Sequence, residues 1–365
     1  MRVLVACDKF KGSLSAVEAA AAMAAGVADS GIREIDCCPI ADGGEGFTEA
    51  MRTALGGFEQ TCEAGDPLGR TVICRYVVAQ SDGHRIGVLE MAEASGFWRV
   101  GQGERAILRA STFGTGELIR HLAEFEQVDR ILLGIGGSAT NDGGAGMAAA
   151  LGVVFRDADG EILVPCPEDL ERTATIDLSG RIRLPEIIVA CDVDNPLLGE
   201  RGATAVFGPQ KGAGPAEQQR LEAYLTRLVE LTGEHATAEI PGAGAAGGMG
   251  FGLMVFAGAR LVSGFDLVAE AVGLRGRVAA ADLVLTGEGS LDAQTLDGKG
   301  PAGVARLAGE YGKRVVAYAG IATAEARESG IFPECHDLAS LGLDFETCMT
   351  HAAELLREQV AATIF

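Results

Sequence analysis

The chain has 365 residues, a formal net charge of −21 and 52 glycines. This length exceeds what one hydrophobic core usually covers, which predicts two domains. Hydrophobic residues make up 48% and charged residues 22%, as is ordinary for globular proteins. The chain has 51 acidic and 30 basic residues, and no Lys/Arg run offsets this excess of negative charge. The composition therefore argues against binding nucleic acid or an anionic membrane.

The nine cysteines include no C-x-x-C pair, and their odd number fits a reducing compartment. The N-terminal apolar run is too short for a signal peptide, so we expect a cytoplasmic protein. The uncharged segment from Ile240 to Ala259 approaches the length of a membrane span, which is about 20 residues. Its first half is mostly Gly and Ala, so we interpret it as a glycine-rich turn running into a buried helix.

Strands and helices alternate at the start of the chain. Val3–Ala6 predicts a strand, and Ser15-Ala-Val-Glu18 fits a capping box that opens a helix reaching Val27. Ile35–Ile40 predicts the next strand, and a helix through Leu55 follows a turn. This order indicates a parallel sheet with crossover helices.

The middle of the chain differs, since Val72–Ala79 and Arg85–Met91 predict an antiparallel hairpin. The alternation then returns, with strands expected at 131–135, 187–190, 283–285 and 314–319, and helices at 146–151, 215–231, from Pro301 and at 345–361. The sequence therefore predicts an α/β protein. A Rossmann-like domain with a parallel sheet would comprise residues 1–62 and 281–365, and an inserted α/β domain with a mixed sheet would comprise 63–280.

Five loops combine glycine with carboxylate, amide or lysine groups, and three of them follow an apolar strand, where ligands bind in open α/β sheets. The first, residues 8–15, ends at a helix start and offers Lys9 and Lys11 to an anion. The second, residues 41–46, offers Asp42 and Glu45 to magnesium or to a proton. Each loop could also be a simple capped turn.

The third loop, Gly134–Gly144, follows a strand and precedes a helix. Its first six residues fit the dinucleotide pattern G-x-G-x-x-G/A, with Asp157 or Asp159 as the ribose acid. Residues 242–247 fit the same pattern, so it has little specificity in this chain. Hydroxyl, amide and carboxylate groups at 138–142 separate the glycines from the helix and suit phosphate and metal, which favours phosphoryl binding over NAD.

The fourth loop carries Asp192 and Asp194, which suit magnesium and its water shell, and Lys211 follows as a candidate phosphate ligand. An Asn-Pro turn with capping aspartates is the alternative. The fifth, from residue 286 to 301, carries Glu288 and Asp292 as acid candidates, and long polar loops between strand and helix are often functional. The five histidines show no metal spacing, and no hydrolase nucleophile motif is present.

Together these loops resemble the bacterial glycerate kinases of the type I family. The motifs run in order almost from end to end: Asp8-Lys-Phe-Lys-Gly-Ser-Leu-Ser-Ala16, Pro39-Ile-Ala-Asp-Gly-Gly-Glu-Gly46, Gly134-Ile-Gly-Gly-Ser-Ala-Thr-Asn-Asp-Gly-Gly144, Ala190-Cys-Asp-Val-Asp-Asn-Pro-Leu197, Phe207-Gly-Pro-Gln-Lys-Gly-Ala213, Gly242-Ala-Gly-Ala-Ala-Gly-Gly248 and Thr286-Gly-Glu-Gly-Ser290, followed by Gln294-Thr295 and Gly298-Lys299. One departure is Cys7, which stands where the family pattern has proline.

The resemblance implies ATP and Mg²⁺, D-glycerate as the acceptor, a phosphoglycerate product, and two α/β domains with a cleft between them, one of them Rossmann- or flavodoxin-like. Close relatives are assigned 2-phosphoglycerate as the product, and 3-phosphoglycerate stays open. Two other readings are an NAD-dependent hydroxy-acid dehydrogenase and a non-catalytic sugar-acid sensor. The sequence does not show the oligomeric state, and a homodimer is left open.

Site residues follow from the loops and the resemblance. The expected catalytic residues are Lys11, Asp42, Asp192 and Glu288, and the expected magnesium ligands are Asp192 and Asp194. The expected nucleotide ligands are Gly136, Gly137, Ser138, Asn141, Lys211, Gly287 and Lys299. The expected glycerate ligands are Asp8, Ser13, Glu45, Asp292 and Gln294. The sequence does not choose among Asp42, Asp192 and Glu288 as the base that accepts the hydroxyl proton.

Overall fold

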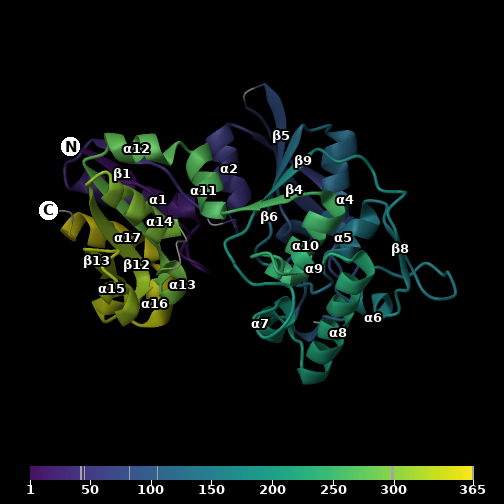
Figure 1. Ribbon diagram of the computed structural model, residues 1–365. Coiled ribbons are helices and arrows are strands. Elements are labelled where there is room, and N and C mark those ends of the chain that lie inside the picture. The colour runs from purple at the N-terminus through teal and green to yellow at the C-terminus, as the bar shows by residue number, and fades with distance from the viewer. Residues whose placement is uncertain (42, 45, 82, 105, 297–299, 364–365) are drawn as a thin grey trace. The chain divides into compact units, whose positions relative to one another are not determined.

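The computed structural model describes residues 1–41, 43–44, 46–81, 83–104, 106–296 and 300–363, apart from the side chains of Gln102 and Gln294. The described chain is an α/β protein that divides into two compact units (Figure 1). Unit 1 comprises Met1–Asp42 and Phe265–Phe365, and unit 2 comprises Gly43–Gly264. Within the described ranges, no helix combines the length and the apolar character needed to cross a bilayer.

The described part of unit 1 is built on a five-stranded sheet in which every pair is parallel. Its strands are β1 (Arg2–Val5), β2 (Glu34–Cys37), β11 (Leu283–Leu291), β12 (Arg314–Ala322) and β13 (Cys335–Asp337). Their spatial order is β13-β12-β11-β1-β2. Counted along the chain of this unit, that is the flavodoxin-like order 2-1-3-4-5, which places the topological switch between β1 and β11. The predicted Rossmann- or flavodoxin-like fold is confirmed.

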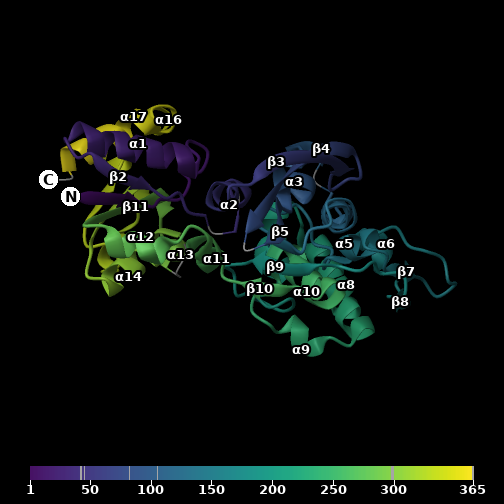
Figure 2. The same cartoon turned by 90° about the horizontal axis from the view of Figure 1, so that it is seen from above.

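Helices cover both faces of this sheet because successive strand residues point to opposite faces. Val3 and Val5 pack into a core with α1 (Ala16–Asp29) and α17 (Ala352–Thr363). Leu4 packs into a second core with α12 (Leu274–Ala280) and α14 (Gly300–Glu310). Figure 2 shows the two pairs of helices on opposite sides of the sheet. The unit also contains α11 (Gly264–Ala271), α13 (Ala293–Leu296), α15 (Ala324–Glu328), η5 (Ala339–Leu341) and α16 (Phe345–Thr350).

Local signals in unit 1 are confirmed in part. The capping box is present, because Ser15 Oγ accepts from Glu18 N at 3.2 Å and Glu18 Oε2 accepts from Ser15 N at 2.8 Å. The single terminal helix predicted from 345 to 361 is wrong, since the non-helical backbone of His351 separates α16 from α17. The predicted loop after 285 is also wrong as far as 291, because β12 extends far enough to keep β11 hydrogen-bonded.

The described part of unit 2 contains a six-stranded mixed sheet in the order β10-β9-β6-β5-β4-β3. Its strands are β3 (Phe58–Gly65), β4 (Thr71–Ser81), β5 (His84–Glu90), β6 (Arg130–Gly134), β9 (Glu186–Ala190) and β10 (Arg260–Val262). The β4–β5 hairpin is antiparallel, as predicted, and β5, β6, β9 and β10 are parallel. The edge strand β3 was not predicted, because most of its residues are exposed and carry no apolar signal.

The main core of unit 2 combines sheet residues such as Leu89, Leu133 and Val189 with apolar helix faces. The helices of the unit are α2 (Phe47–Leu55), α3 (Ala92–Ser95), η1 (Phe97–Arg99), η2 (Gln102–Glu104), α4 (Phe113–Arg120), the π-helix η3 (His121–Phe125), α5 (Ala145–Ala150), α6 (Pro167–Leu170), α7 (Ala203–Phe207), η4 (Pro209–Lys211), α8 (Pro215–Thr232), α9 (His235–Ala238) and α10 (Ala245–Ala257). A small antiparallel pair, β7 (Val154–Arg156) and β8 (Thr175–Asp177), lies outside the main sheet. The predicted buried helix in the uncharged segment 240–259 corresponds to α10.

The compact units divide after residues 42 and 264, whereas the sequence placed domain boundaries after 62 and 280. Helix α2 packs on β4 and β5 in unit 2. Phe265 and Leu274 pack in a core of unit 1. The two predicted folding domains, 1–62 with 281–365 and 63–280, stay a prediction.

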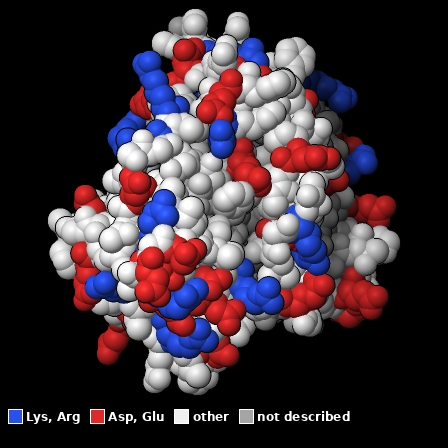
Figure 3. Space-filling view, turned by 90° about the vertical axis from the view of Figure 1, so that its right-hand side faces the viewer, with Lys and Arg blue, Asp and Glu red and all other residues white. Residues whose placement is uncertain are grey.

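The molecular face in Figure 3 carries acidic and basic side chains interspersed with uncharged ones. Blue and red side chains lie next to one another in several places, and no continuous basic area is visible on this face. This face therefore offers no extended positive surface to a polyanion.

Candidate active site

Three of the predicted loops meet in unit 2. Strands β6 and β9 are parallel neighbours, with Gly134 opposite Ala190, so the loops that follow them leave the sheet side by side. Gly44, from the second loop, lies so close to this edge that a Cβ on Gly136 would be 2.5 Å from its Cα. The described parts of the second, third and fourth loops therefore share one edge of the sheet. Asp42 and Glu45 lie outside the described residues.

The third loop binds a buried lysine. Lys211, at the end of η4, is 5% exposed, and its Nζ donates to Ser138 Oγ and to the Thr140 carbonyl oxygen, both at 2.7 Å. Burial lowers the pKa of Lys211 to about 7, and the charge of Asp142 opposes that shift. Two predicted nucleotide ligands, Ser138 and Lys211, are thus brought together although 73 positions separate them.

Asp142 holds the loop in shape. Its carboxylate accepts from Thr112 N at 2.7 Å, Thr112 Oγ1 at 2.8 Å, Gly144 N at 3.1 Å and Gly146 N at 3.2 Å. The residue is fully buried, and burial raises its pKa while these four hydrogen bonds oppose the rise. Since the carboxylate is so fully engaged within the protein, we assign it to loop architecture.

Two buried polar atoms of the loop have no partner among the described residues. Asn141 donates from Nδ2 to Thr204 Oγ1 at 3.0 Å, but its Oδ1 accepts no hydrogen bond there, and neither does Thr140 Oγ1 make one. Both residues are 0% exposed. Buried polar atoms are normally hydrogen-bonded, so these two mark the loop as a place where water or a ligand is accommodated.

The glycine-rich segment 242–248, which includes the first residues of α10, packs against the third loop. Gly143 N donates to Gly247 O at 3.0 Å, and a Cβ on Gly247 would lie 2.0 Å from the Thr140 carbonyl oxygen. The same segment reaches the fourth loop, because Gly242 N and Gly244 N both donate to Asn195 O. The second match to the dinucleotide pattern is therefore a packing element.

A small pocket opens above Lys211. It is small and partly open, and apolar groups line it around the lysine. The lining residues are Leu68, Phe97, Val100, Ala106, Ile107, Ala110, Ala139 and Lys211. Lys211 is the residue of this set that carries an ionisable side chain, so the charge in the pocket depends on its protonation.

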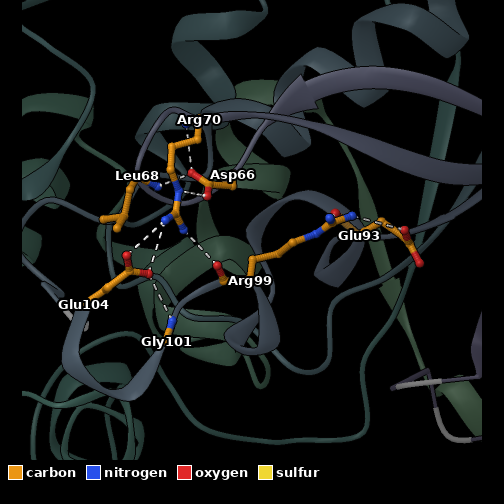
Figure 4. Close-up of polar contacts among 7 residues, drawn as sticks. All are labelled: Asp66, Leu68, Arg70, Glu93, Arg99, Gly101 and Glu104. Carbon is orange, nitrogen blue, oxygen red and sulfur yellow. Dashed lines mark hydrogen bonds and ion pairs between the residues drawn. The ribbon is translucent and has the colours of Figure 1, made fainter.

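Charged residues beside the pocket are engaged with one another (Figure 4). Arg70 donates to Asp66 at 2.5 Å, to Glu104 at 3.2 Å and to the Arg99 carbonyl oxygen at 2.9 Å. Arg99 in turn donates from Nε to the Glu93 carbonyl oxygen at 2.8 Å. These contacts join the segment containing Leu68 to the segment containing Val100, and both arginines also form ion pairs with acidic side chains.

The two predicted magnesium ligands, Asp192 and Asp194, differ in their contacts. Asp192 is half-buried, and its Oδ1 accepts from Gly264 N at 2.9 Å, whereas the exposed Asp194 forms an ion pair with Arg201 at 2.8 Å. Within the described residues, no group of three or more His, Cys, Asp or Glu is arranged to hold a metal. Mg²⁺ is usually held by one or two carboxylates together with substrate phosphates, and Asp192 fits that mode better than Asp194.

The first and fifth predicted loops meet in unit 1, at the switch point between β1 and β11. Asp8 N donates to Gly287 O at 2.8 Å, and Gly289 N donates to Lys9 O at 3.2 Å, so the two chain segments run side by side. Asp8 is 4% exposed, and its Oδ1 lies 3.9 Å from Lys9 Nζ. Lys11 is exposed.

Other predicted residues of unit 1 lie around this point. Glu288 Oε1 accepts from Thr295 Oγ1 at 2.6 Å, and Asp292 Oδ1 accepts from Thr295 N at 3.4 Å. Ser13 Oγ is buried without a partner among the described residues. The Gln294 side chain and all of Lys299 lie outside the described part of the chain. The unit therefore gathers carboxylates where unit 2 gathers a lysine and neutral oxygens.

Sequence reasoning missed the pocket wall and the partners of the third loop. Residues 66–69, Asp-Pro-Leu-Gly, have the signature of a type I turn, and Gly69 N does donate to Asp66 O at 2.9 Å. That signal could have located the turn. No local pattern connects Thr112 with Asp142 or Thr204 with Asn141, because tertiary packing alone makes these pairs.

The dehydrogenase reading loses its structural basis. A dinucleotide fold needs a second parallel strand after the loop and helix, with an acid at its end. Here β7 follows α5 and pairs with β8 outside the main sheet. Asp157 Oδ1 accepts from Asp159 N and Glu161 N within a turn, and Asp157 pairs with Arg172.

Comparisons with known proteins agree with the motif order. The family model for the glycerate kinase family matches residues 3–365. The chain is 44% identical to a glycerate kinase of Halalkalibacterium halodurans over 87% of this chain and 85% of that one. It is 43% identical to the glycerate 2-kinase of Escherichia coli over 88% and 86%. A crystal structure assigned as glycerate kinase 2 of Salmonella typhimurium LT2 matches with a TM-score of 0.84 and 41% identity, covering 99% of this chain and 96% of that one.

The resemblance seen in the sequence is thus confirmed over almost the whole chain, and the solved relative has the same α/β fold. Relatives named as glycerate kinases are phosphotransferases that use an alcohol group as acceptor, and such kinases take their phosphoryl group from ATP. The chain belongs to the glycerate kinase family and is a phosphotransferase of that kind.

Proposed function

We propose that this enzyme transfers the γ-phosphoryl group of ATP to the 2-hydroxyl of D-glycerate, giving 2-phosphoglycerate. The observation that carries the proposal is the Ser138–Lys211 contact, which puts a buried lysine on the glycine-rich loop after β6. The choice of the 2-hydroxyl has the support of the Escherichia coli relative, whose name specifies the 2-kinase. The alternative product, 3-phosphoglycerate, has no separate observation in its favour.

Phosphoryl transfer depends on positioning and on positive charge near the transferring oxygens. In this proposal the loop from Gly136 to Ser138 and the Lys211 side chain bind ATP phosphate. Lys11 is exposed at the switch point of unit 1 and is available to a phosphate or to the glycerate carboxylate. Asn141, Gly287 and Lys299 stay predicted nucleotide ligands.

The base that accepts the hydroxyl proton is proposed to be a carboxylate from these loops. Glu288 is half-buried and accepts from Thr295, which fixes one of its oxygens, and Asp192 is fixed in the same way by Gly264 N. Asp42 stays the third candidate. Asp8, Ser13, Glu45, Asp292 and Gln294 stay predicted glycerate ligands.

Magnesium is proposed to accompany ATP. Asp192, at the carboxyl end of β9, would hold the ion together with nucleotide phosphates, and Asp194 would contribute after leaving its ion pair with Arg201. When bound, the ion would screen the negative charge of the phosphates.

The proposal also includes a cytoplasmic location. All nine cysteines are free, and six of them are buried or half-buried thiols whose pKa is raised, mainly by burial, which suits a reducing compartment. A homodimer is kept as a prediction without structural support.

The test is to incubate the protein with ATP, magnesium and D-glycerate and to identify the product by ³¹P and ¹H NMR. We expect ADP and 2-phosphoglycerate in equal amounts. Formation of 3-phosphoglycerate would refute the position of transfer, and NADH production from glycerate and NAD without ADP formation would refute the kinase. Glycerate binding without ATP turnover would revive the sensor reading.

A further inference from the structure

The hydrogen bonding of Lys211 matches a neutral amine better than an ammonium ion. The side chain makes two hydrogen bonds, to Ser138 Oγ and to the Thr140 carbonyl oxygen. A neutral amine has two N–H groups to donate, whereas an ammonium ion has three. Both acceptors are uncharged, and neither of these contacts of Nζ is an ion pair. A permanently charged lysine would be poorly matched to this setting.

The charged groups around the pocket do not supply the missing counter-charge. Asp142 acts on Lys211 through space, but its carboxylate already accepts four hydrogen bonds. Tyr224, on α8, donates to the Asp142 backbone oxygen at 2.8 Å, and burial raises its pKa, so it stays neutral. Beside the pocket, Arg70 and Arg99 are paired with acidic residues.

This amine borders the small pocket. Lys211 lines it, and the other lining residues are apolar, so an anionic group that enters meets one basic side chain in poorly solvated surroundings. An opposite charge brought within a few Å favours the charged form of a group, and the effect grows as solvent is excluded. Burial already brings the pKa of Lys211 to about 7, where a single new anion shifts its charge state across the neutral range.

We propose that Lys211 is largely unprotonated in the ligand-free enzyme above neutral pH and takes up a proton when a phosphate group of ATP enters the pocket. The proton comes from the solvent and forms the third N–H bond of the ammonium, which is donated to a phosphate oxygen. This inference rests on the proposed function, since it identifies how the nucleotide centre acquires its positive charge. ATP binding would therefore be coupled to proton uptake.

Isothermal titration calorimetry tests the coupling directly. ATP with magnesium chloride, without glycerate, is titrated into the full-length protein at pH 8 in buffers of different ionisation enthalpy, and the dependence of the heat on buffer gives the number of protons taken up. We expect an uptake approaching one proton per ATP at pH 8, falling strongly at pH 6, where Lys211 is already charged.

Two variants test whether Lys211 is the group that takes up the proton. Lys211→Arg keeps a permanent charge and should bind ATP with no uptake beyond that of the nucleotide itself, because arginine does not deprotonate in proteins. The matched control Lys313→Met removes a half-exposed lysine at the end of the helix–strand turn before β12 and should keep the full uptake. Circular dichroism and the thermal midpoint would establish that each variant is folded.

The outcomes distinguish the two proposals. ATP binding without proton uptake at pH 8, or equal uptake by the unaltered protein and Lys211→Arg, would overturn this inference and leave the kinase assignment standing. Absence of both ATP binding and ATP turnover in the unaltered protein would overturn the proposed function as well.

Discussion

The candidate centres of the two units obey one topological rule and differ in chemistry. Each lies where neighbouring parallel strands end, β6 and β9 in unit 2 and β1 and β11 in unit 1. In unit 2 the fold buries Lys211 against neutral oxygens, whereas in unit 1 it gathers Asp8, Glu288 and Asp292. Strand order therefore determines where a site forms, and the loop residues determine which charge it carries.

The largest expected effect concerns the base, and it would show which centre performs the proton transfer. Glu288→Gln, Asp192→Asn and Asp42→Asn are made one at a time, and we expect one of them to lower kcat by about 10²–10⁴-fold. Glu310→Gln is the control, since Glu310 is an exposed carboxylate paired with Arg275. Near-normal kcat in all three variants would remove both centres as the source of the base.

The next effect is on the free energy of unfolding, and it compares the third loop with the fifth. Asp142→Ala leaves three buried backbone N–H groups without their acceptor, so we expect the free energy of unfolding to fall by about 3 kcal/mol or more. Asp292→Ala in unit 1 removes a capping contact to Thr295 N, with an expected loss of about 1 kcal/mol. Urea denaturation measures both, and equal losses would show that the third loop is no more rigidly built than the fifth.

The buried lysine predicts a pH-dependent effect. The folded-state pKa of Lys211 is about 7, below its ordinary value of 10.5. Between these values the unfolded chain binds the proton and the folded protein does not, so this group makes stability rise with pH across that window. Below pH 7 both states are protonated, and the full penalty of burying the charge is present.

Lys211→Met removes that penalty, so its stability relative to the unaltered protein should be more favourable at pH 6 than at pH 9, by about 2–3 kcal/mol. Denaturant titrations at the two pH values measure the difference, and Lys313→Met should show none. An effect of Lys211→Met that is the same at both pH values would mean that the lysine titrates normally in the folded protein.

The smallest expected effect concerns the magnesium candidates. Asp194→Asn breaks an exposed ion pair with Arg201, which should change stability by less than about 1 kcal/mol. Asp192→Asn should raise the magnesium concentration needed for half-maximal activity more than Asp194→Asn does, because Asp192 is half-buried at the end of β9. The opposite ranking, obtained by magnesium titration of activity, would make the exposed aspartate the principal ligand.

The sequence predicts those parts of the fold whose signals are local. The capping box of α1, the β4–β5 hairpin and the apolar strand β6 all follow from short patterns, and the structure confirms them. The extension of β11 past residue 285 has no such pattern, because Thr286-Gly-Glu-Gly-Ser290 resembles a loop and becomes a strand only through pairing with β12. The polar strand β3 also lacks a local pattern and forms through its pairing with β4.

The site shows the same limit. Sequence motifs named Ser138 and Lys211 as members of one centre, and their hydrogen bond agrees with this. The motifs could not show that Lys211 is buried, that apolar side chains surround it, or that Asp142 serves the loop instead of a ligand, because residues distant in sequence determine each of these properties. The charge state of a side chain such as Lys211 depends on its burial and its neighbours, and the fold determines both.

The most direct test of the account is the activity of Lys211→Met with ATP as the varied substrate, measured beside Lys313→Met. If the Ser138–Lys211 centre binds the phosphates of ATP, Lys211→Met should lower kcat/KM for ATP by about 10²–10³-fold while the protein stays folded, and Lys313→Met should match the unaltered enzyme. An unchanged kcat/KM in Lys211→Met would contradict the assignment of this centre to the nucleotide.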